Sequence, residues 1–297
     1  MVLACEEPEL YQHPPQTRHL ADVFQELTRA NSQVIVSTHN PIFVSGEGFE
    51  DVRIVHKGSG SPCSSVSHMA FADIARAVDA AAGKPPSKPE GALAKVHQAL
   101  QAGLNEMFFT RRLILIEGLE DWAYLLTYLK LLERYEDYRR MGCHVVPANG
   151  KSELIQPLII AKHMGIATYV IFDADADKPD KNGSRVKHEQ DNKALLTLLG
   201  VPNQNPMPGT TIWGTGFTMW HSDIGSIVEA DIGEGDWKVS RDKADALYGH
   251  AGGLKKNVLH IGASLAFAWD QKKRSCNLER LCCEILNPSN QVAQNSV

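Results

Sequence analysis

The chain has 297 residues, of which 43% are hydrophobic and 22% charged, and its formal net charge is −5 at pH 7. These values are typical of a globular protein, and the negative charge excludes a uniformly basic nucleic-acid coat while leaving room for a local basic patch. The cysteines show no C-x-x-C pair and no zinc spacing, so we expect reduced thiols in a cytoplasmic protein. No apolar run reaches the roughly 18 residues that span a bilayer, and we expect no membrane association.

Two apolar strands with polar ends are predicted within residues 1–56. In "MVLACEEPEL" the first strand ends at Glu6 and Glu7. Such a pair of acids is typical of a Walker B element, in which the first acid helps to hold Mg²⁺ and the second polarises the attacking water. The second strand, in "SQVIVSTHNPIFV", places His39 where it can reach a γ-phosphate. Together the two stretches resemble the C-terminal part of an ABC-type ATPase head.

The chain contains no G-x-x-x-x-G-K-[ST] loop to hold nucleotide phosphates. Without the backbone N–H groups and the lysine of that loop, we expect no ATP hydrolysis by this chain alone. The simplest account is a truncated product that lost its N-terminal half, so that ATP is a cofactor only of a full-length protein. The alternative for Glu6, Glu7 and His39 is a vestigial pair of structural strands.

A change in composition separates this segment from the rest of the chain. "GSGSPCSSVS" is rich in turn-forming residues, and "GKPPSKPEG" at 83–91 is a proline-rich linker. A short helix is predicted in "MAFADIARAVDAAA" between them, and another over roughly 92–106. We therefore divide the chain into a partial ATPase head at 1–83, a linker with a connecting helix at 84–106, and a second domain at 107–297.

The second domain begins with a short buried strand that ends in an acid. Residues 113–116 are apolar, Glu117 lies at the carboxyl end of this strand, and Gly118 interrupts it. A helix with an apolar face is predicted over 123–132. Strand ends in α/β folds point into the crevice where ligands bind, which favours a functional Glu117. The alternative is a solvated acid in a βα turn.

A second buried strand, residues 169–172, is followed by Asp173, Asp175 and Asp177. Alternate acids on an extended segment point the same way, as in a D-x-D pair that grips one divalent cation. Three like charges this close repel one another unless a metal or protonation neutralises them, so a solvated loop is the weaker alternative. The basic stretch 178–188 directly afterwards is a candidate for contact with a nucleic-acid backbone.

The stretch "GCHVVPANGKSELIQPL" predicts a strand that ends at Val146 and a helix that begins near Ser152. Because helix N-termini preceded by glycine favour anions, Gly150, Lys151 and Ser152 are candidate contacts to a nucleic-acid phosphate. The alternative is a plain βα loop with no ligand.

Two later stretches carry further candidates. Glu229 and Asp231 alternate after the short apolar run 227–228, but other acids nearby make this assignment less secure. Lys255 and Lys256 precede a predicted amphipathic helix. A lysine beside a metal-rich acidic site can stabilise the charge that develops on a phosphate in the transition state. The alternative is a pair of surface lysines.

A strand ending in Glu-Gly and a later strand ending in D-x-D form the signature of the Toprim domain, which topoisomerases, primases and several nucleases share. "LILIEGLEDWAYL" and "YVIFDADAD" resemble it closely. With "EEPELYQHP" and "STHNP", the chain resembles the OLD (overcoming lysogenization defect) family of ATP-dependent endonucleases. The resemblance implies an α/β fold, in which a Rossmann-like, mainly parallel sheet flanked by helices follows a partial ABC-type ATPase fragment. It is weaker over 57–105 and 180–225.

The resemblance also implies a nuclease site with two Mg²⁺ or Mn²⁺ ions. Matched by motif position, the metal ligands are Glu117, Asp121, Asp173, Asp175, Glu229 and Asp231. Lys256, or less closely Lys255, matches the late lysine of the family, and catalytic roles fall to Glu117, Asp173 and Lys256. The chain departs from the pattern at Gly233, where the late acidic motif usually has another acid.

We therefore expect a metal-dependent DNA endonuclease that hydrolyses phosphodiester bonds by a two-metal mechanism. Carboxylate ligands suit hard divalent cations, whereas zinc would require His or Cys ligands that these motifs lack. The expected partners are DNA and, in a full-length protein, a second copy bound through the ATPase head. Two alternatives remain: a haloacid-dehalogenase-like phosphatase with Asp173 as nucleophile, and a non-catalytic fragment for DNA binding or dimerisation.

Overall fold

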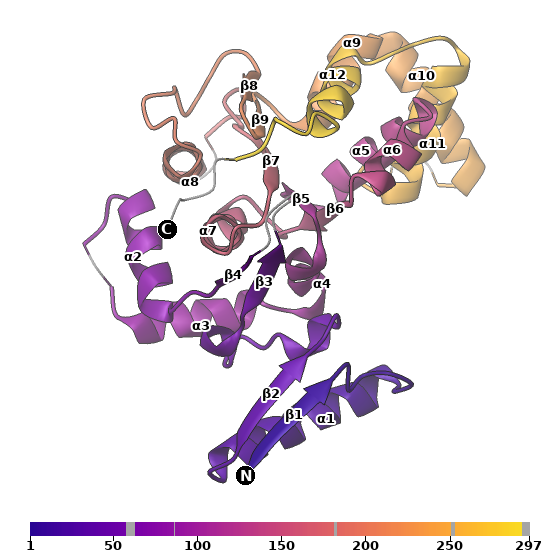
Figure 1. Ribbon diagram of the computed structural model, residues 1–297. Helices are drawn as coiled ribbons and strands as arrows, with labels where there is room; N and C mark the ends of the chain where they lie inside the picture. The colour runs from indigo at the N-terminus through magenta and orange to yellow at the C-terminus, as the bar shows by residue number, and fades with distance from the viewer. Residues whose placement is uncertain (58–62, 86, 181–182, 251–252, 293–297) are drawn as a thin grey trace.

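The structure of the protein is a computed structural model that describes residues 1–57, 63–85, 87–180, 183–250 and 253–292. Its first elements are β1 (Val2–Glu6), α1 (Pro14–Arg29) and β2 (Gln33–Ser37). The two strands pair in parallel, as expected for strands joined by a crossover helix. This N-terminal unit lies at one end of the molecule (Figure 1).

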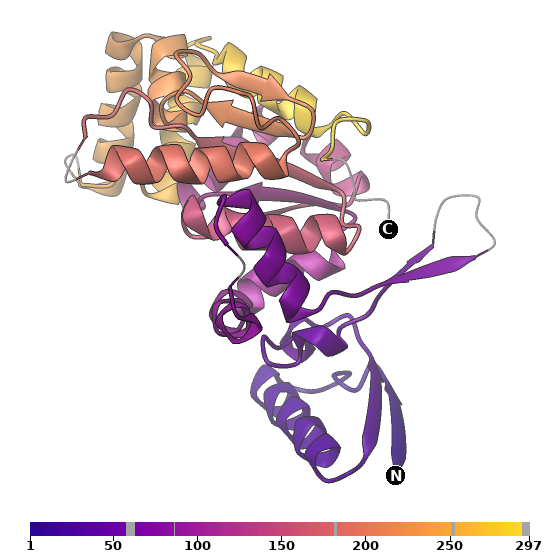
Figure 2. The same ribbon diagram turned by 90° about the vertical axis from the view of Figure 1, so that its left-hand side faces the viewer.

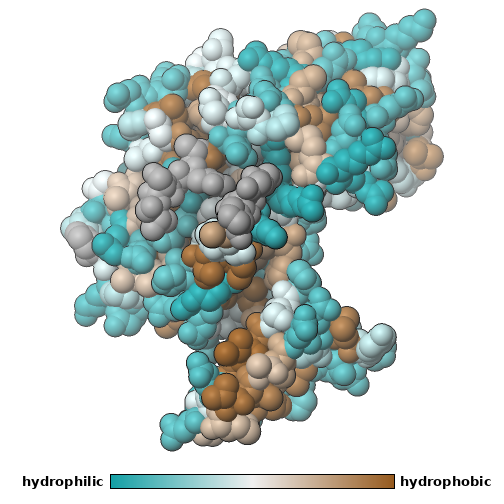
Figure 3. All heavy atoms as spheres, in the orientation of Figure 1, coloured by the Kyte–Doolittle hydropathy of each residue, from teal (hydrophilic) through white to brown (hydrophobic). Residues whose placement is uncertain are grey.

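The N-terminal unit buries only one face of its sheet. Half-buried residues alternate with exposed residues along both strands, and α1 packs on β2. On the other face Val2 and Ile35 are 68% and 54% exposed. Figure 3 shows hydrophobic residues gathered over this end of the molecule.

A mainly helical region connects this unit to the large sheet. Its strands and helices are β3 (Ile54–Lys57), β4 (Ser64–Ser67), α2 (Phe71–Ala81), α3 (Pro89–Ala99) and α4 (Ala102–Asn105). Short 3-10 turns lie at Pro41–Phe43, Phe49–Asp51 and Glu106–Phe109. The helices predicted from the sequence are present as α2 and as α3 followed by α4. Phe49, Ile74 and Met107 share one hydrophobic core with a face of the large sheet, which fixes the region to that sheet.

The large sheet has five strands in the order β6-β5-β7-β9-β8. Their bounds are β5 (Arg112–Ile116), β6 (Cys143–Pro147), β7 (Thr168–Asp173), β8 (Ile212–Gly214) and β9 (Phe217–Trp220). The first four in this order run parallel, and only β8 at the edge is antiparallel. The predicted α/β class with a mainly parallel sheet is therefore confirmed.

Helices cover both faces of this sheet (Figure 2). The helices of the second half are α5 (Leu119–Leu131), α6 (Tyr135–Arg140), α7 (Ile155–His163), α8 (Ser184–Leu198), α9 (Ile224–Ile232), α10 (Glu234–Tyr248), α11 (Val258–Asp270) and α12 (Cys276–Ile285). Leu113 and Leu115 of β5 pack in one core with α7 and α8. Ile114 and Ile116 pack in a second core with α5, α9, α11 and α12. Burial on both faces explains why β5 is apolar throughout.

The parallel strands bring the segments that follow them to one edge of the sheet. β5, β7 and β9 all point their carboxyl ends to this edge, so the residues that follow Ile116, Phe172 and Trp220 lie close together. Ligands of open α/β sheets bind at such an edge. Among the helices of the described residues, none is both long and apolar enough to cross a membrane.

Candidate active site

Glu117 and Asp173 meet at the carboxyl edge of the sheet. Glu117 follows β5, Asp173 ends β7, and these two strands are neighbours. The backbone N–H of Asp173 donates a hydrogen bond of 2.8 Å to Oε1 of Glu117. Two acids far apart in the sequence are thus held side by side, as the strand-end motifs require.

Asp121 joins this pair from the first turn of α5. Its Oδ2 accepts a hydrogen bond of 3.0 Å from the backbone N–H of Gly118, and only 5% of the residue is exposed. The helix begins at Leu119 rather than at the predicted residue 123, since acids in a first turn interact favourably with the helix dipole. The earlier start turns Asp121 inward, next to Glu117.

Burial and neighbouring negative charges make the three acids hard to ionise. Burial raises the pKa of Asp121 to about 7, and the negative charge of Glu117 adds to the rise. Burial also raises the pKa of Asp173 well above its usual range, with further contributions from the charges of Asp121 and Glu117. The pKa of Glu117 is raised by burial against the opposing effect of the nearby charge of Lys151. We call Glu117, Asp121 and Asp173 the acid triad.

The acid triad has donor atoms that suit a hard cation. Oδ1 of Asp173 is buried, and no group among the described residues hydrogen-bonds to it. A buried carboxylate oxygen without a partner is costly, and a divalent ion is one group that satisfies it. As the side chains stand, no three His, Cys, Asp or Glu residues in the described ranges converge closely enough to hold an ion. To hold one ion together, the three carboxylates would have to rotate within the site.

Asp175 lies in a different environment from Asp173. Its φ of 54° is left-handed, so the chain leaves strand geometry directly after β7 and the two acids do not alternate on one extended segment. Lys151 and Lys178 reach the Asp175 carboxylate at 2.7 and 2.5 Å, and Nδ1 of His188 lies 3.2 Å away. Burial alone would raise the pKa of Asp175, but hydrogen bonds from the two lysines outweigh it and lower that pKa.

The residues of the predicted phosphate loop at 150–152 form hydrogen bonds and an ion pair with other parts of the protein. Lys151 is 6% exposed at its side chain and pairs with Asp175. The hydroxyl of Ser152 donates a hydrogen bond of 2.7 Å to Asp191 in α8, and the backbone N–H of Gly150 donates one to the Glu117 carbonyl. This loop thus supports the acids, and contact with a DNA phosphate stays a prediction.

The segment with Glu229 and Asp231 is the helix α9 and not an extended strand end. Since residues two apart on a helix point in different directions, the two acids separate. Glu229 faces a cavity and pairs with Arg241 at 3.0 Å. Asp231 faces α12 instead, where it accepts hydrogen bonds from the hydroxyl of Ser275 at 2.6 Å and from the backbone N–H of Asn277 at 2.9 Å. Asp231 therefore caps the start of α12.

Asp223 is the acid at the third strand end. It follows β9 and begins α9, where its Oδ1 accepts a hydrogen bond of 2.9 Å from the backbone N–H of Ser226. Its negative charge is among those that raise the pKa of Asp173. Asp223 was not among the predicted ligands, because the short strand β9 was not identified from the sequence. The sequence pattern that could have indicated its position is an N-cap residue directly before an apolar helical run.

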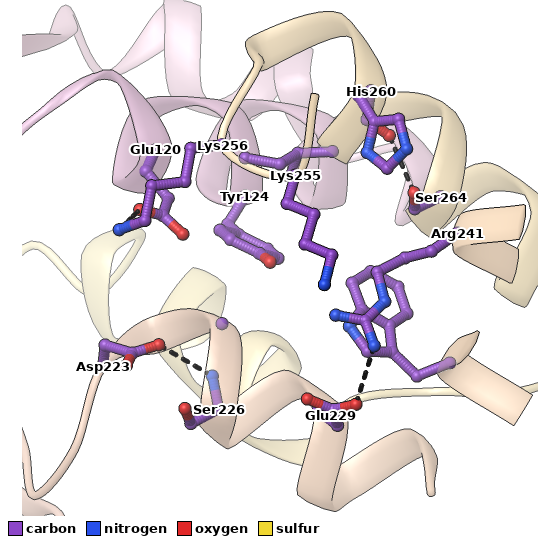
Figure 4. Close-up of a pocket in the computed structure, with 13 residues that line it drawn as sticks. Glu120, Tyr124, Asp223, Ser226, Glu229, Arg241, Lys255, Lys256, His260 and Ser264 are labelled. Atoms are coloured by element: carbon purple, nitrogen blue, oxygen red, sulfur yellow. Dashed lines mark hydrogen bonds and ion pairs between the residues drawn. The ribbon is translucent and has the colours of Figure 1, made fainter. Parts of the chain in front are cut away.

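Both late lysines border a cavity of about 160 Å³ next to Asp223. Nζ of Lys256 pairs with Oε2 of Glu120 at 2.8 Å, and this hydrogen bond raises the lysine pKa. The side chain of Lys255 points into the cavity toward Arg241 and Glu229 (Figure 4). The sequence did not indicate Glu120 or Arg241, since these contacts join segments far apart in the chain.

The N-terminal acids lie in the separate unit formed by β1, α1 and β2. Nε2 of His39 lies 3.6 Å from Oε1 of Glu7, and both follow the ends of the paired strands, while Glu6 ends β1 opposite Ser37. Figure 1 shows this unit at one end of the molecule, away from β5 and β7, which lie near its middle. The predicted nucleotide residues are therefore brought together, and they lie apart from the acid triad.

Comparison with known proteins agrees with these features. Residues 108–175 match the family model for the TOPRIM domain of overcoming lysogenization defect protein-like proteins, and residues 1–44 match the AAA ATPase domain. An OLD nuclease of Thermus scotoductus is 30% identical over 199 residues, which cover 64% of this chain and 34% of that protein. The chain thus spans about a third of the length of this relative.

Among solved structures, the C-terminal region of the Burkholderia pseudomallei OLD protein matches with a TM-score of 0.37 and 15% identity. The match covers 60% of this chain and 97% of that one. The family models and the OLD nuclease relative, taken with the strand-end acids, confirm the resemblance predicted from the motifs. Residues 108–175 of this chain are thus similar to the TOPRIM domain of OLD-like proteins, and residues 1–44 are similar to part of an AAA ATPase domain.

Proposed function

We propose that the chain is a cytoplasmic DNA endonuclease that depends on Mg²⁺ or Mn²⁺ and hydrolyses phosphodiester bonds. The observation that carries this proposal is the acid triad, in which burial and neighbouring negative charges raise the pKa of the carboxyls, and Oδ1 of Asp173 has no hydrogen-bond partner among the described residues. The OLD nuclease relative supports the same reaction class.

Glu117, Asp121 and Asp173 would hold one of the two predicted ions. A divalent ion there supplies a water of lowered pKa and polarises the scissile phosphate. Glu117 keeps the backbone of Asp173 in place through its hydrogen bond, and Asp121 is fixed by the Gly118 N–H. The late lysines line the cavity beside Asp223, and a cation that reaches the phosphate from there would stabilise the charge that develops on it.

Binding of DNA relies on basic groups away from the acids. Arg185 and Lys187 at the start of α8 are exposed and belong to the basic stretch 178–188, of which residues 181–182 lie outside the described part. Lys255 at the cavity is also exposed. We propose that these cations contact the DNA backbone, and that the N-terminal unit serves nucleotide binding and pairing of two copies in a longer protein.

The phosphatase alternative has less support. The match over 108–175 covers both the Glu-Gly and the D-x-D strand ends, whereas a haloacid-dehalogenase-like site needs only the second. The buried Oδ1 of Asp173 lies in a carboxyl whose pKa is raised by the charges of two further acids, which suits a shared cation better than a lone nucleophile.

The test is nicking of supercoiled plasmid with Mg²⁺, Mn²⁺, Ca²⁺ or EDTA, with and without ATP. We expect open-circle product with Mg²⁺ or Mn²⁺, none with EDTA, and none for Asp173→Asn under any condition. The matched control is Asp177→Asn, because Asp177 belongs to the same run of acids but is exposed and accepts its hydrogen bond from Ser222. Full activity of Asp173→Asn or nicking that resists chelation would refute the proposal. A wild-type chain that binds DNA but never nicks it would favour the non-catalytic alternative.

A further inference from the structure

The acids around the carboxyl edge fall into two groups that differ in their counter-charges. In the acid triad, Oδ1 of Asp173 has no hydrogen-bond partner within the described ranges. The second group, Asp175 and Asp223, has a protein partner for every carboxylate oxygen. Oδ1 of Asp175 faces Lys178, and its Oδ2 faces Lys151. Only one of the two groups is therefore short of a positive charge.

Lys178 links the two acids of the second group. Its Nζ lies 2.5 Å from Oδ1 of Asp175 and 3.7 Å from Oδ2 of Asp223. The other oxygen of Asp223 accepts the backbone N–H of Ser226. A single ammonium group thus bridges carboxylates that come from the ends of two different strands, β7 and β9.

The backbone places Lys178 for this contact. The left-handed residue Asp175 starts a turn in which the N–H of Lys178 donates to the carbonyl of Asp175, so the lysine side chain folds back over the acid three positions earlier. Lys151 approaches the same carboxylate from the loop after β6 and is almost fully buried. Two carboxylates and two ammonium groups balance in charge, so the lysines cancel the attraction that the carboxylates would otherwise exert on a divalent ion.

We infer that the ammonium group of Lys178 occupies the position of a second cation between Asp175 and Asp223, so that the site takes up one divalent ion at the acid triad. This inference rests on the proposed function, since it concerns the cations of the same site. It replaces the expectation of two bound ions with one ion and one built-in charge. Lys178 is the replaceable partner because 46% of its side chain is exposed, whereas Lys151 is buried.

The test is the number of Mn²⁺ ions bound per chain, measured by calorimetry and by the electron paramagnetic resonance signal of free Mn²⁺. We expect one ion for the wild type and for Lys178→Arg, which keeps the charge. We expect two ions for Lys178→Gln, because Asp175 and Asp223 are then short of one positive charge. Lys187→Gln is the matched control: this exposed lysine follows in α8, and we expect one ion.

The double variant Lys178→Gln with Asp223→Asn locates the additional ion and should return the count to one. Thermal melts of each variant, followed by circular dichroism, verify folding before the titration. Two ions in the wild type, or one ion in a folded Lys178→Gln, would overturn the inference while leaving the nuclease proposal intact. No ion in either protein would contradict the proposed function itself, and the inference with it.

Discussion

Replacing Asp121 by Asn removes a charge from the acid triad with little change in shape. The amide oxygen of Asn can still accept the Gly118 N–H that Asp121 accepts at 3.0 Å. Because the wild-type carboxyl is buried and surrounded by acids, its ionisation opposes folding. We therefore expect Asp121→Asn to stabilise the metal-free protein at neutral and alkaline pH.

The size of this effect follows from the pKa of Asp121. Burial and neighbouring acids raise that pKa to about 7 in the folded protein. An unfolded Asp titrates near 3.9, so a difference of about 3 pKa units corresponds to about 4 kcal/mol. The folded state holds the proton more tightly, so the wild type loses this stability as pH rises from about 4 to about 7 and loses no more above that range. Because the ionisation of Asp121 is coupled to that of Glu117 and Asp173, about 4 kcal/mol is an upper limit for its effect on the free energy of unfolding.

The assay is urea unfolding of both proteins in EDTA at pH 5, 6, 7 and 8, followed by tryptophan fluorescence. The free-energy difference in favour of Asp121→Asn should grow by up to about 3 kcal/mol between pH 5 and pH 8. Saturating Mg²⁺ should narrow the difference at pH 8, because only the wild type keeps the full triad. A difference that stays constant with pH, or a variant less stable than the wild type at pH 8 in EDTA, would refute the reasoning.

Three further substitutions separate the roles of the predicted site residues. Glu117→Gln keeps an acceptor for the Asp173 N–H but loses a charge, so the protein should fold. Mutation of a residue that only hydrogen-bonds to a metal ligand lowers activity roughly 10–100-fold, and the loss of plasmid nicking in Glu117→Gln should be larger than that. Asp231→Ala leaves donors of α12 unsatisfied and should cost about 1–3 kcal/mol in urea unfolding, with nicking unchanged below the melting temperature. Lys256→Gln should slow single-turnover cleavage by about 10-fold or more without weakening DNA binding in filter assays. An unchanged rate would mean that Lys256 has no catalytic role and only pairs with Glu120.

The convergence of Glu117 and Asp173 could be predicted because parallel strands share a carboxyl edge. Both strands are short apolar runs that end in an acid, and burial on both faces produces that pattern. The position of Asp121 also followed from its motif, although the predicted helix began four residues late. Its inward direction depends on the Gly118 cap, which only the structure reveals.

Other parts of the site depend on geometry that the sequence does not encode locally. Ile227 and Val228 form an apolar pair that fits a strand as well as a helix, and the structure shows a helix that separates Glu229 from Asp231. The left-handed backbone at Asp175 is allowed for Asp but not signalled by its neighbours. The pairing of Lys178 with Asp223 joins two strand ends, so it became visible only when β9 was placed beside β7.

The central claim is that Glu117, Asp121 and Asp173 bind a divalent ion, and the anomalous scattering of Mn²⁺ in a crystal of this protein tests it most directly. We expect an anomalous peak within about 2.5 Å of carboxylate oxygens from all three acids, and no such peak in crystals of Asp173→Asn. A Mn²⁺ peak bound only elsewhere, or an empty triad at saturating Mn²⁺, would contradict the account.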